Sequence, residues 1–401
     1  MQKSKIYPKV LVVSESPLSL DNGFGVTLHN LFNKWPQEKI GVFYTHKYIQ
    51  HQTLGQRCVF QRHSHIHWHH GRRYALPMLV GIKPSWRNRY SLLWLKRNLG
   101  RYKPSLVYTL FHSEATLHFG SWIARRLKIP HVIHAADDGL SLSQQTQEDI
   151  HSSSARYVIS NLMAEEYRRR YNTSFQVLHN VAPKEYYQAA SPIHQSPAYR
   201  EKVSMTMRYL GRMHSWLHYD SIKLLDAAID KCSENSIHWN LEIYGSADED
   251  SLRSSQIINQ NVTYHGPVSR EQGIKLLHSS DLLVIPLTYN KDILHFYKFS
   301  FPAKLTEYLA TGVPILLLSD QSAASTLFCQ SYSVAHCITS PNVDLIQKYL
   351  TRIWEDPSEG IAQGARNVTL ARSKFDKSAI TATFQASLCS VVSRNLQNIY
   401  H

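Results

Sequence analysis

Short apolar segments alternate with helical patterns along this sequence, and the alternation breaks in a polar stretch before starting again near residue 200. Strand-length apolar runs separated by helices are typical of parallel sheets built from βαβ units. The 401 residues also exceed the roughly 250 to 300 that one hydrophobic core organises. The sequence therefore predicts an α/β protein with two Rossmann-like domains.

The predicted elements fall into two domains, 1–185 and 200–375. A polar stretch at 182–202 that contains three prolines is expected to connect them. Residues 376–401 are expected to form a final helix that packs back on the first domain. The predicted strands are 10–14, 40–44, 106–110, 131–134, 157–160, 205–210, 239–244, 262–265, 282–286 and 314–317, and the predicted helices are 26–33, 90–98, 113–126, 221–231, 270–279, 302–311 and 378–397.

Composition predicts a cytoplasmic protein without a membrane span. The longest apolar runs, such as 281–287, fall well short of the roughly 18 residues that span a bilayer. The first apolar stretch runs directly into a loop, so it is expected to be a strand and not a signal peptide. Five cysteines without a CxxC pair favour a reducing compartment.

The net charge of +14 is concentrated in residues 39–113, which contain no Asp or Glu. Clustered cations with interleaved aromatic residues attract anionic lipid headgroups, phosphorylated acceptors or nucleic acid. We favour peripheral binding to an anionic membrane surface or an anionic acceptor, with no nucleic-acid partner; a solvated surface without a partner is the alternative. The cations are Lys39, Lys47, Arg57, Arg62, Arg72, Arg73, Lys83, Arg87, Arg89, Lys96, Arg97, Arg101 and Lys103.

Glycines and an arginine are expected where parallel strands end, which is where open α/β sheets bind ligands. Gly23 and Gly25 are placed in the loop between strand 10–14 and the next helix, where the backbone approaches a ligand and the helix N-terminus favours an anion. Arg212 directly follows strand 205–210, and its planar fork suits a diphosphate. A turn without a ligand and an ordinary surface arginine are the alternatives.

The segment 299–316, FSFPAKLTEYLATGVPIL, predicts a short helix that opens at Pro302 and ends at Gly312. Ser300, Lys304 and Glu307 lie near its beginning or along one side. A carboxylate there can accept both hydroxyls of a ribose, while the lysine and the helix N-terminus can face phosphate or sugar oxygens. An exposed Lys/Glu pair is the alternative.

In order, these segments resemble the GT-B glycosyltransferases, most closely the retaining family-4 type (glycosyl transferases group 1). The resemblance implies two domains facing each other across a cleft. It also implies transfer of a hexose-type sugar from a nucleotide diphosphate donor to a hydroxyl of a glycan or lipid-linked acceptor, with retention, as in polysaccharide biosynthesis. The matching segments are the glycine loop, IPHVIHAADD, YVISNLMAEEYRRRYNTSFQVLHNV, RYLGRM, LEIYGSADE, NVTYHGPVSREQ and SFPAKLTEYLATGVPIL.

The resemblance implies roles in donor binding for residues of both domains. Gly23 and Gly25 would approach the donor phosphates or sugar, and Arg212 would bind the diphosphate. Ser300 and Lys304 would lie beside the sugar and phosphates.

The nucleoside is assigned to the second domain in the same way. Glu307 would accept the ribose hydroxyls, and the backbone near His265 and Gly266 would face the base. Two positions depart from the family's pattern: Phe299 stands where a sugar-binding Glu is common, and residues 214–220 lack the usual Lys after Gly-Arg. A catalytically weak or inactive nucleotide-sugar binder of the same fold is therefore the alternative, and a nucleic-acid-binding or base-glycosylating protein is a more distant one.

The polar cluster His134, Asp137 and Asp138 follows strand 131–134, on the side of the cleft where an acceptor would lie. A carboxylate there would orient or deprotonate the acceptor hydroxyl, and the histidine would bond a sugar hydroxyl. Capping by the two aspartates is the alternative. The histidine run at 63–70 is expected to form a polar strand face, so we expect neither a metal nor another cofactor.

Overall fold

The computed structural model describes the backbone of residues 7–19, 23–45, 60–63, 66–69, 72–75, 84–187 and 203–400. The chain forms two compact units. The first consists of Met1–His179 and Ser378–His401, and the second consists of Asn180–Lys377. The two-domain α/β architecture expected from the sequence is confirmed.

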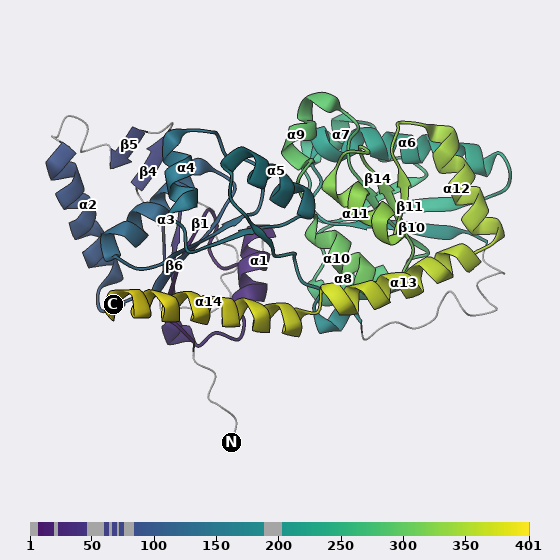
Figure 1. The fold of residues 1–401 in the computed structure, drawn as a ribbon. Helices are drawn as coiled ribbons and strands as arrows, with labels where there is room; N and C mark the ends of the chain where they lie inside the picture. Colours follow the sequence, from purple (N-terminus) through teal and green to yellow (C-terminus); the bar gives the residue numbers. More distant parts are fainter. Residues whose placement is uncertain are drawn as a thin grey trace, which may run out of the picture. The chain divides into compact units, whose positions relative to one another are not determined.

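The first unit is built on a seven-stranded parallel sheet in the order β3-β2-β1-β6-β7-β8-β9 (Figure 1). Its strands are β1 (Val10–Ser14), β2 (Ile40–Tyr44), β3 (Phe60–His63), β6 (Leu106–Phe111), β7 (His131–Ala135), β8 (Ala155–Val158) and β9 (Gln176–Val177). An antiparallel pair, β4 (Ile66–His69) and β5 (Arg72–Ala75), is separate from it. The helices are α1 (Gly23–Phe32), α2 (Pro84–Leu99), α3 (Glu114–Leu127), α4 (Gln144–His151), α5 (Asn161–Tyr171) and α14 (Lys377–Tyr400).

Helices cover both faces of this sheet, which is why all five residues of β1 are buried. Val10 and Val12 point into one core cluster, whereas Leu11 and Val13 point into another. The first cluster includes Phe384 of α14, the long yellow helix in Figure 1. The chain's last helix therefore completes the core of the unit in which the chain begins.

The second unit has a six-stranded parallel sheet in the order β12-β11-β10-β13-β14-β15. Its strands are β10 (Met205–Leu210), β11 (Trp239–Tyr244), β12 (Val262–Gly266), β13 (Leu282–Pro286), β14 (Ile315–Leu318) and β15 (His336–Ile338). The helices are α6 (Ser215–Ser233), α7 (Glu249–Ser254), α8 (Arg270–His278), α9 (Leu294–Tyr297), α10 (Ala303–Thr311), α11 (Ala324–Tyr332), α12 (Val343–Glu355) and α13 (Ser358–Lys374), with 3₁₀ turns η1 (Gln37–Lys39) in the first unit and η3 (Lys184–Tyr186) and η6 (Lys291–Ile293) here.

Helix α10 is short because both of its ends are determined by special residues. Pro302 is its N-cap, and Gly312 ends it in the left-handed region at φ 74°. A Cβ on Gly364 of α13 would lie 1.9 Å from the carbonyl oxygen of Gly312, so these two glycines let the helices approach at backbone distance. This packing fixes the position of the helix that carries Lys304 and Glu307.

Most predicted elements coincide with observed ones, and three have different ends. Helix α2 begins at Pro84, six residues before the predicted 90. Strand β8 ends two residues before the predicted 160, because the Ser160 hydroxyl accepts a bond from the amide of Met163 and caps α5. Helix α6 begins at Ser215, well before the predicted 221. Within the described part of the chain, no helix is long and apolar enough to cross a membrane.

Candidate functional site

The loop after β10 places Arg212 at the carboxyl edge of the second unit's sheet. Strand β10 lies between β11 and β13, where the strand order reverses and open α/β sheets bind ligands. The amide of Gly211 donates to the carbonyl of Tyr244 (2.8 Å), and the hydroxyl of Tyr209 donates to the carbonyl of Arg212 (2.9 Å). These bonds hold the loop backbone while the Arg212 side chain remains exposed.

Lys304, in the first turn of α10, reaches the same loop. Its Nζ lies 5.1 Å from the centroid of the Tyr209 ring, a cation–π contact. Burial disfavours the charged ammonium and lowers the pKa of Lys304 to about 8, although the carboxylate of Glu307 acts in the opposite direction. A lysine with this pKa is mostly charged at neutral pH, and a bound anion would favour the charged form further.

Arg212 and Lys304 form what we call the cation group, and His214 is their neighbour. Burial and the charges of Arg212 and Lys304 lower the pKa of His214, which places the three side chains within electrostatic reach of one another. His214 is also the N-cap of α6, so the free amides of that helix's first turn open at the same place. Positive side chains and a helix N-terminus together make a binding site for phosphate oxygens.

Glu307 follows Lys304 by one turn of α10 and lies among residues of two other elements. Burial raises the pKa of Glu307, against the opposing influence of the Arg270 charge and a hydrogen bond with the Tyr186 hydroxyl. Arg270 also pairs with Glu185 (3.1 Å), and its guanidinium lies 5.6 Å from the centroid of the Tyr186 ring. This arrangement orients a carboxylate that can accept hydrogen bonds from vicinal hydroxyls.

Ser300 and His265 lie on the flanks of this edge. Ser300 is half-buried three residues before α10, with its amide bonded to the carbonyl of Tyr297 (3.0 Å). His265 is exposed, and its ring stacks on Tyr244 with centroids 4.5 Å apart and planes at 8°. Gly266 ends β12 at φ 76°.

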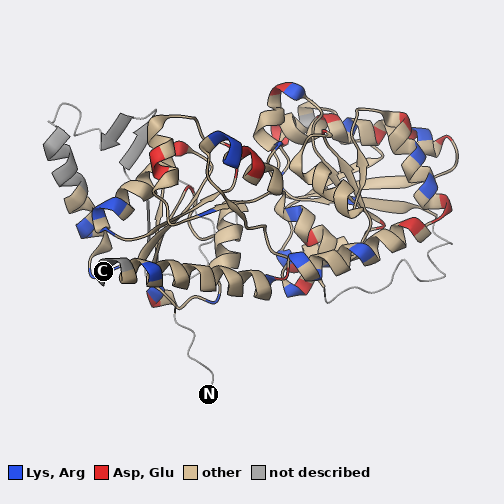
Figure 2. Cartoon of the chain, in the orientation of Figure 1, with Lys and Arg blue, Asp and Glu red and all other residues tan. Residues whose placement is uncertain are grey.

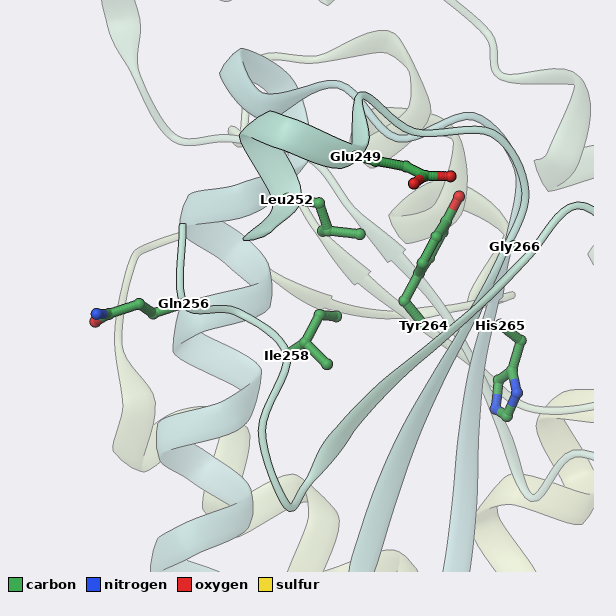
Figure 3. Close-up of a pocket in the computed structure, with 7 residues that line it drawn as sticks. All are labelled: Glu249, Leu252, Gln256, Ile258, Tyr264, His265 and Gly266. Carbon is green, nitrogen blue, oxygen red and sulfur yellow. The ribbon is translucent and has the colours of Figure 1, made fainter. Parts of the chain in front are cut away.

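A pocket of about 440 Å³ opens beside β12 (Figure 3). Tyr264 points from the strand toward Glu249, while the neighbouring His265 points away from Tyr264. The hydroxyl of Tyr264 donates to the carbonyl of Gly245 (2.8 Å). The lining residues are Glu249, Leu252, Gln256, Ile258, Tyr264, His265 and Gly266.

In the first unit, the structure brings together Glu15 and His112, which the sequence reasoning missed. Glu15 follows β1, and His112 follows the neighbouring β6. The buried Glu15 carboxylate accepts bonds from His112 Nδ1 (2.6 Å), the amides of His112 (3.0 Å) and Ser113 (3.0 Å), and the Ser113 hydroxyl (2.7 Å). The same strand-end reasoning that selected Arg212 would have found both residues.

Electrostatics distinguish the two partners. Burial would raise the pKa of Glu15, but the bonds and charge of His112 outweigh burial and lower it. Burial would lower the pKa of His112, but Glu15, with a smaller contribution from Asp137, outweighs burial and raises it. Because Glu15 holds Nδ1–H, the neutral tautomer of His112 has its lone pair on Nε2, and the side chain is 41% exposed.

Two of the three residues predicted to act on an acceptor have other partners. His134 is in the core at 1% exposure, its Nδ1 lies 2.7 Å from the Tyr108 hydroxyl, and burial lowers its pKa to about 3. Asp138 forms a two-bond ion pair with Arg170 (2.8 and 2.9 Å) and accepts a bond from Tyr167. The expectation that His134 faces a substrate is therefore corrected, because both faces of β7 are covered and all five of its residues are buried. Asp137 is the member of the cluster that interacts with His112.

The glycine loop is corrected as well, because both glycines lie inside α1 and not before it. A Cβ on Gly25 would lie 2.3 Å from the carbonyl oxygen of Ser19, so close packing of the chain on itself accounts for this glycine. Nothing lies within 4 Å of a Cβ on Gly23. The roles of Gly23 and Gly25 in donor binding stay predictions.

Among the described residues, no group of three or more His, Cys, Asp and Glu side chains is arranged to hold a metal ion. The histidine run lies partly outside those residues. Its described members fall on β3 and β4, which belong to different sheets.

Comparison with known proteins identifies the fold. The family model described as "Glycosyl transferases group 1" matches residues 204–341. No curated protein sequence matches. The structure of HepE from Anabaena in complex with UDP and glucose is similar at 14% identity, covering 96% of this chain and 100% of that one, with a TM-score of 0.65.

Two further solved structures have the same fold. Sucrose-phosphate synthase from Thermosynechococcus elongatus has 13% identity over 97% of this chain and 100% of its own, with a TM-score of 0.63. WaaG, a glycosyltransferase involved in lipopolysaccharide biosynthesis, has 13% identity over 94% and 98%, with a TM-score of 0.57. This chain thus has the fold of the GT-B glycosyltransferases, and residues 204–341 of its second unit match the glycosyl transferases group 1 model.

Proposed function

We propose that this protein transfers a hexose from a nucleoside-diphosphate sugar to a hydroxyl of a glycan or lipid-linked acceptor, with retention of configuration. The observation that carries the proposal is the convergence of the cation group and Glu307 at the carboxyl edge of one sheet. Cations for a diphosphate and an oriented carboxylate for a ribose are the two elements that a nucleoside-diphosphate donor requires.

The cation group would act on the leaving diphosphate. As the glycosidic bond breaks, negative charge grows on the departing phosphate oxygens, and fixed positive charge stabilises that transition state more than the ground state. Arg212 offers two parallel N–H donors, and the phosphates would hold the Lys304 ammonium in its charged form. We propose that no bound metal takes part.

The acceptor hydroxyl is assigned to His112, with Asp137 beside it. His112 Nε2 would accept the hydroxyl's hydrogen bond, and Glu15 would fix the ring and its tautomer. His112 thus takes the acceptor-binding role that the sequence predicted for His134, which is buried. Asp138, which is paired with Arg170, would act by shaping the loop.

Uridine donors are the first to test, because the HepE structure holds UDP and glucose. Thermal unfolding is measured with the bare nucleotides UDP, GDP and ADP and with their sugars, with and without EDTA. One base should stand out, since a ligand that binds only the folded state raises the midpoint temperature of unfolding. Turnover of the selected donor with a glycan or lipid-linked acceptor would then establish transfer. A protein that binds none of these compounds at millimolar concentration contradicts the proposal.

A second candidate is a nucleotide-sugar binder without turnover. It is favoured by Phe299, which is 7% exposed and offers no carboxylate at the position where the family commonly has a sugar-binding Glu. Tight donor binding without transfer or donor hydrolysis across a broad acceptor panel would support this candidate.

Peripheral attachment to the cytoplasmic face of a membrane is proposed from the basic region 39–113, part of which lies outside the described residues. Lys96, Arg97, Arg101 and Lys103 are exposed at or just after the end of α2, and Lys39 is half-buried (Figure 2). Binding to anionic vesicles that high salt reverses would support attachment, and equal binding to neutral vesicles would contradict it.

A further inference from the structure

Trp216 and Phe296 form an exposed aromatic pair in the second unit. Their ring centroids are 5.8 Å apart with planes at 59°, and the side chains are 49% and 58% exposed. Trp216 belongs to the first turn of α6, and Phe296 belongs to α9, so two elements distant in sequence present one apolar surface. Contiguous exposed aromatic surface is unfavourably hydrated, and covering it with a ligand removes that unfavourable hydration.

The segment that carries Phe296 is firmly held. The hydroxyl of its neighbour Tyr297 donates to the carbonyl of Thr288 (2.5 Å) in the buried interior. The amide of Ala324 donates to the carbonyl of Lys298 (2.7 Å) just after α9. The aromatic pair is therefore a preformed surface on fixed backbone.

The aromatic pair adjoins the cation group through His214. The His214 ring lies 5.6 Å from the Trp216 ring, and the charges of Arg212 and Lys304 lower the pKa of the same histidine. On the other side, the ring of His295 lies 4.0 Å from Phe296. The aromatic pair is thus bordered by the imidazoles of His214 and His295, and the site proposed for phosphate adjoins it on the His214 side.

We propose that Trp216 and Phe296 form the platform on which the hexose ring of the donor lies; this inference rests on the proposed function. In a nucleoside-diphosphate sugar the hexose is bonded to the outer phosphate, so a surface adjoining the phosphate site is where that ring must fall. One face of a pyranose presents C–H groups to the electron-rich face of an aromatic ring, and because the two planes are tilted by 59°, the second ring would border the sugar's edge. The bordering imidazoles match the hydroxyls at the rim.

The small size of the surface argues for one sugar and against a protein partner. A stable protein interface covers about 800 Å² on each partner, whereas here two side chains with histidine neighbours form the apolar surface. The platform also offers an apolar substitute for the sugar-binding carboxylate that Phe299 replaces.

The test compares each nucleotide with its sugar form. Affinities of UDP, UDP-glucose, UDP-galactose and UDP-N-acetylglucosamine are measured by calorimetry, together with the GDP and ADP counterparts. For the base that the wild type binds, Trp216→Ala and Phe296→Ala should weaken the nucleotide sugar roughly fivefold or more, the scale of one lost ring contact. Binding of the bare nucleotide should not change.

Two variants serve as matched controls. Trp216→Phe keeps an aromatic face and should keep the affinity for the nucleotide sugar. It should also abolish any change in tryptophan fluorescence that the nucleotide sugar produces and the bare nucleotide does not. Leu345→Ala removes a comparably exposed apolar side chain from α12 and should change nothing.

The remaining outcomes are decisive. A wild type that binds no nucleotide removes both the proposed function and the platform. A second outcome overturns the platform alone: the wild type binds a nucleotide, but Trp216→Ala and Phe296→Ala do not change the ratio of the nucleotide-sugar affinity to the bare-nucleotide affinity for any hexose. Variants that raise only the KM of the acceptor, or that lose only vesicle binding, assign the aromatic pair to an acceptor or a lipid surface and also overturn it.

Discussion

A Cβ on Gly211 would lie 1.7 Å from Cε of Lys304 and 2.5 Å from its Nζ. The Lys304 side chain occupies the space that a side chain at position 211 would fill. Gly211, in the loop after β10, therefore allows Lys304 of α10 to reach this loop. The usual Lys after Gly-Arg is missing from this chain, and Lys304 brings an ammonium to the loop from another element.

Replacing Gly211 with Ala should therefore displace the Lys304 side chain without mutating it, and it also strains the loop backbone, which lies at φ 153°. We expect Gly211→Ala and Lys304→Met each to weaken binding of the preferred nucleoside diphosphate by about tenfold, since each removes one charge-assisted contact. Calorimetry on the two single variants and the double variant measures the coupling. If both act through the same ammonium, the double variant loses little more than either single one; additive losses would contradict the relationship.

Nucleotide binding should weaken as the pH rises through about 8, the pKa of Lys304 in the free protein. Below that pH the ammonium is charged and attracts the phosphates, and above it the charge is lost. A bound diphosphate favours the charged form, so binding near pH 8 should take up a proton, which calorimetry in buffers of different ionisation enthalpy detects. Lys304→Met should abolish the uptake; an unchanged uptake in that variant would assign it to another group.

Stability should change in the opposite direction to binding. A lysine in the unfolded chain has its ordinary pKa of 10.5, whereas the pKa of Lys304 in the folded chain is about 8. Between these two pH values the unfolded state therefore binds more protons than the folded state. The free energy of unfolding should rise with pH across that window in the wild type relative to Lys304→Met. Denaturant unfolding at several pH values measures this difference, and parallel curves for the two proteins would contradict the burial of a charged lysine.

Glu307 should discriminate between ribose and deoxyribose. We expect Glu307→Ala to weaken nucleotide binding more than tenfold, because the ribose hydroxyls lose their acceptor. The variant should also bind a nucleoside diphosphate and its 2′-deoxy form equally well, whereas the wild type prefers the ribose form. Glu271→Gln, which changes an exposed carboxylate paired with Lys275, is the matched control. A preference for ribose that survives in Glu307→Ala would remove Glu307 from this role.

His112 and Glu15 should affect transfer while leaving nucleotide affinity intact. We expect His112→Gln to reduce turnover roughly a hundredfold, the scale of one positioned proton-transfer or hydrogen-bonding group. In Glu15→Gln the pKa of His112 should fall, because the carboxylate that raises it is gone. An NMR titration of His112 checks this shift, and a titration that Glu15→Gln leaves unchanged would contradict the pairing.

The sequence predicted what depends on local pattern. Strands such as β1, β10 and β11 coincide with their predicted ranges because their apolar runs are short and bounded, and the ends of α10 follow from Pro302 and Gly312. The positions of Arg212 and Lys304 follow from where these elements end.

The sequence did not predict what depends on three-dimensional neighbours. His134 has a side chain that could bind a substrate, but it lies on a strand whose two faces are both covered, and it is therefore buried. Glu15 and His112 are 97 residues apart, and only the pairing of β1 with β6 brings them together. Gly25 is a glycine because of the Ser19 backbone, which no sequence pattern indicates.

The return of α14 to the first unit also governs how the protein emerges during synthesis. Phe384 contacts the rings of Phe32 and Tyr108, and the hydroxyl of Tyr157 lies 2.5 Å from that of Ser387. A ribosome that has made the first 377 residues has supplied all of the second unit but not the helix that closes the first core. The first unit thus cannot complete its core before α14 is made, and a chain that stops before α14 would leave the first unit, and not the second, exposed to proteases.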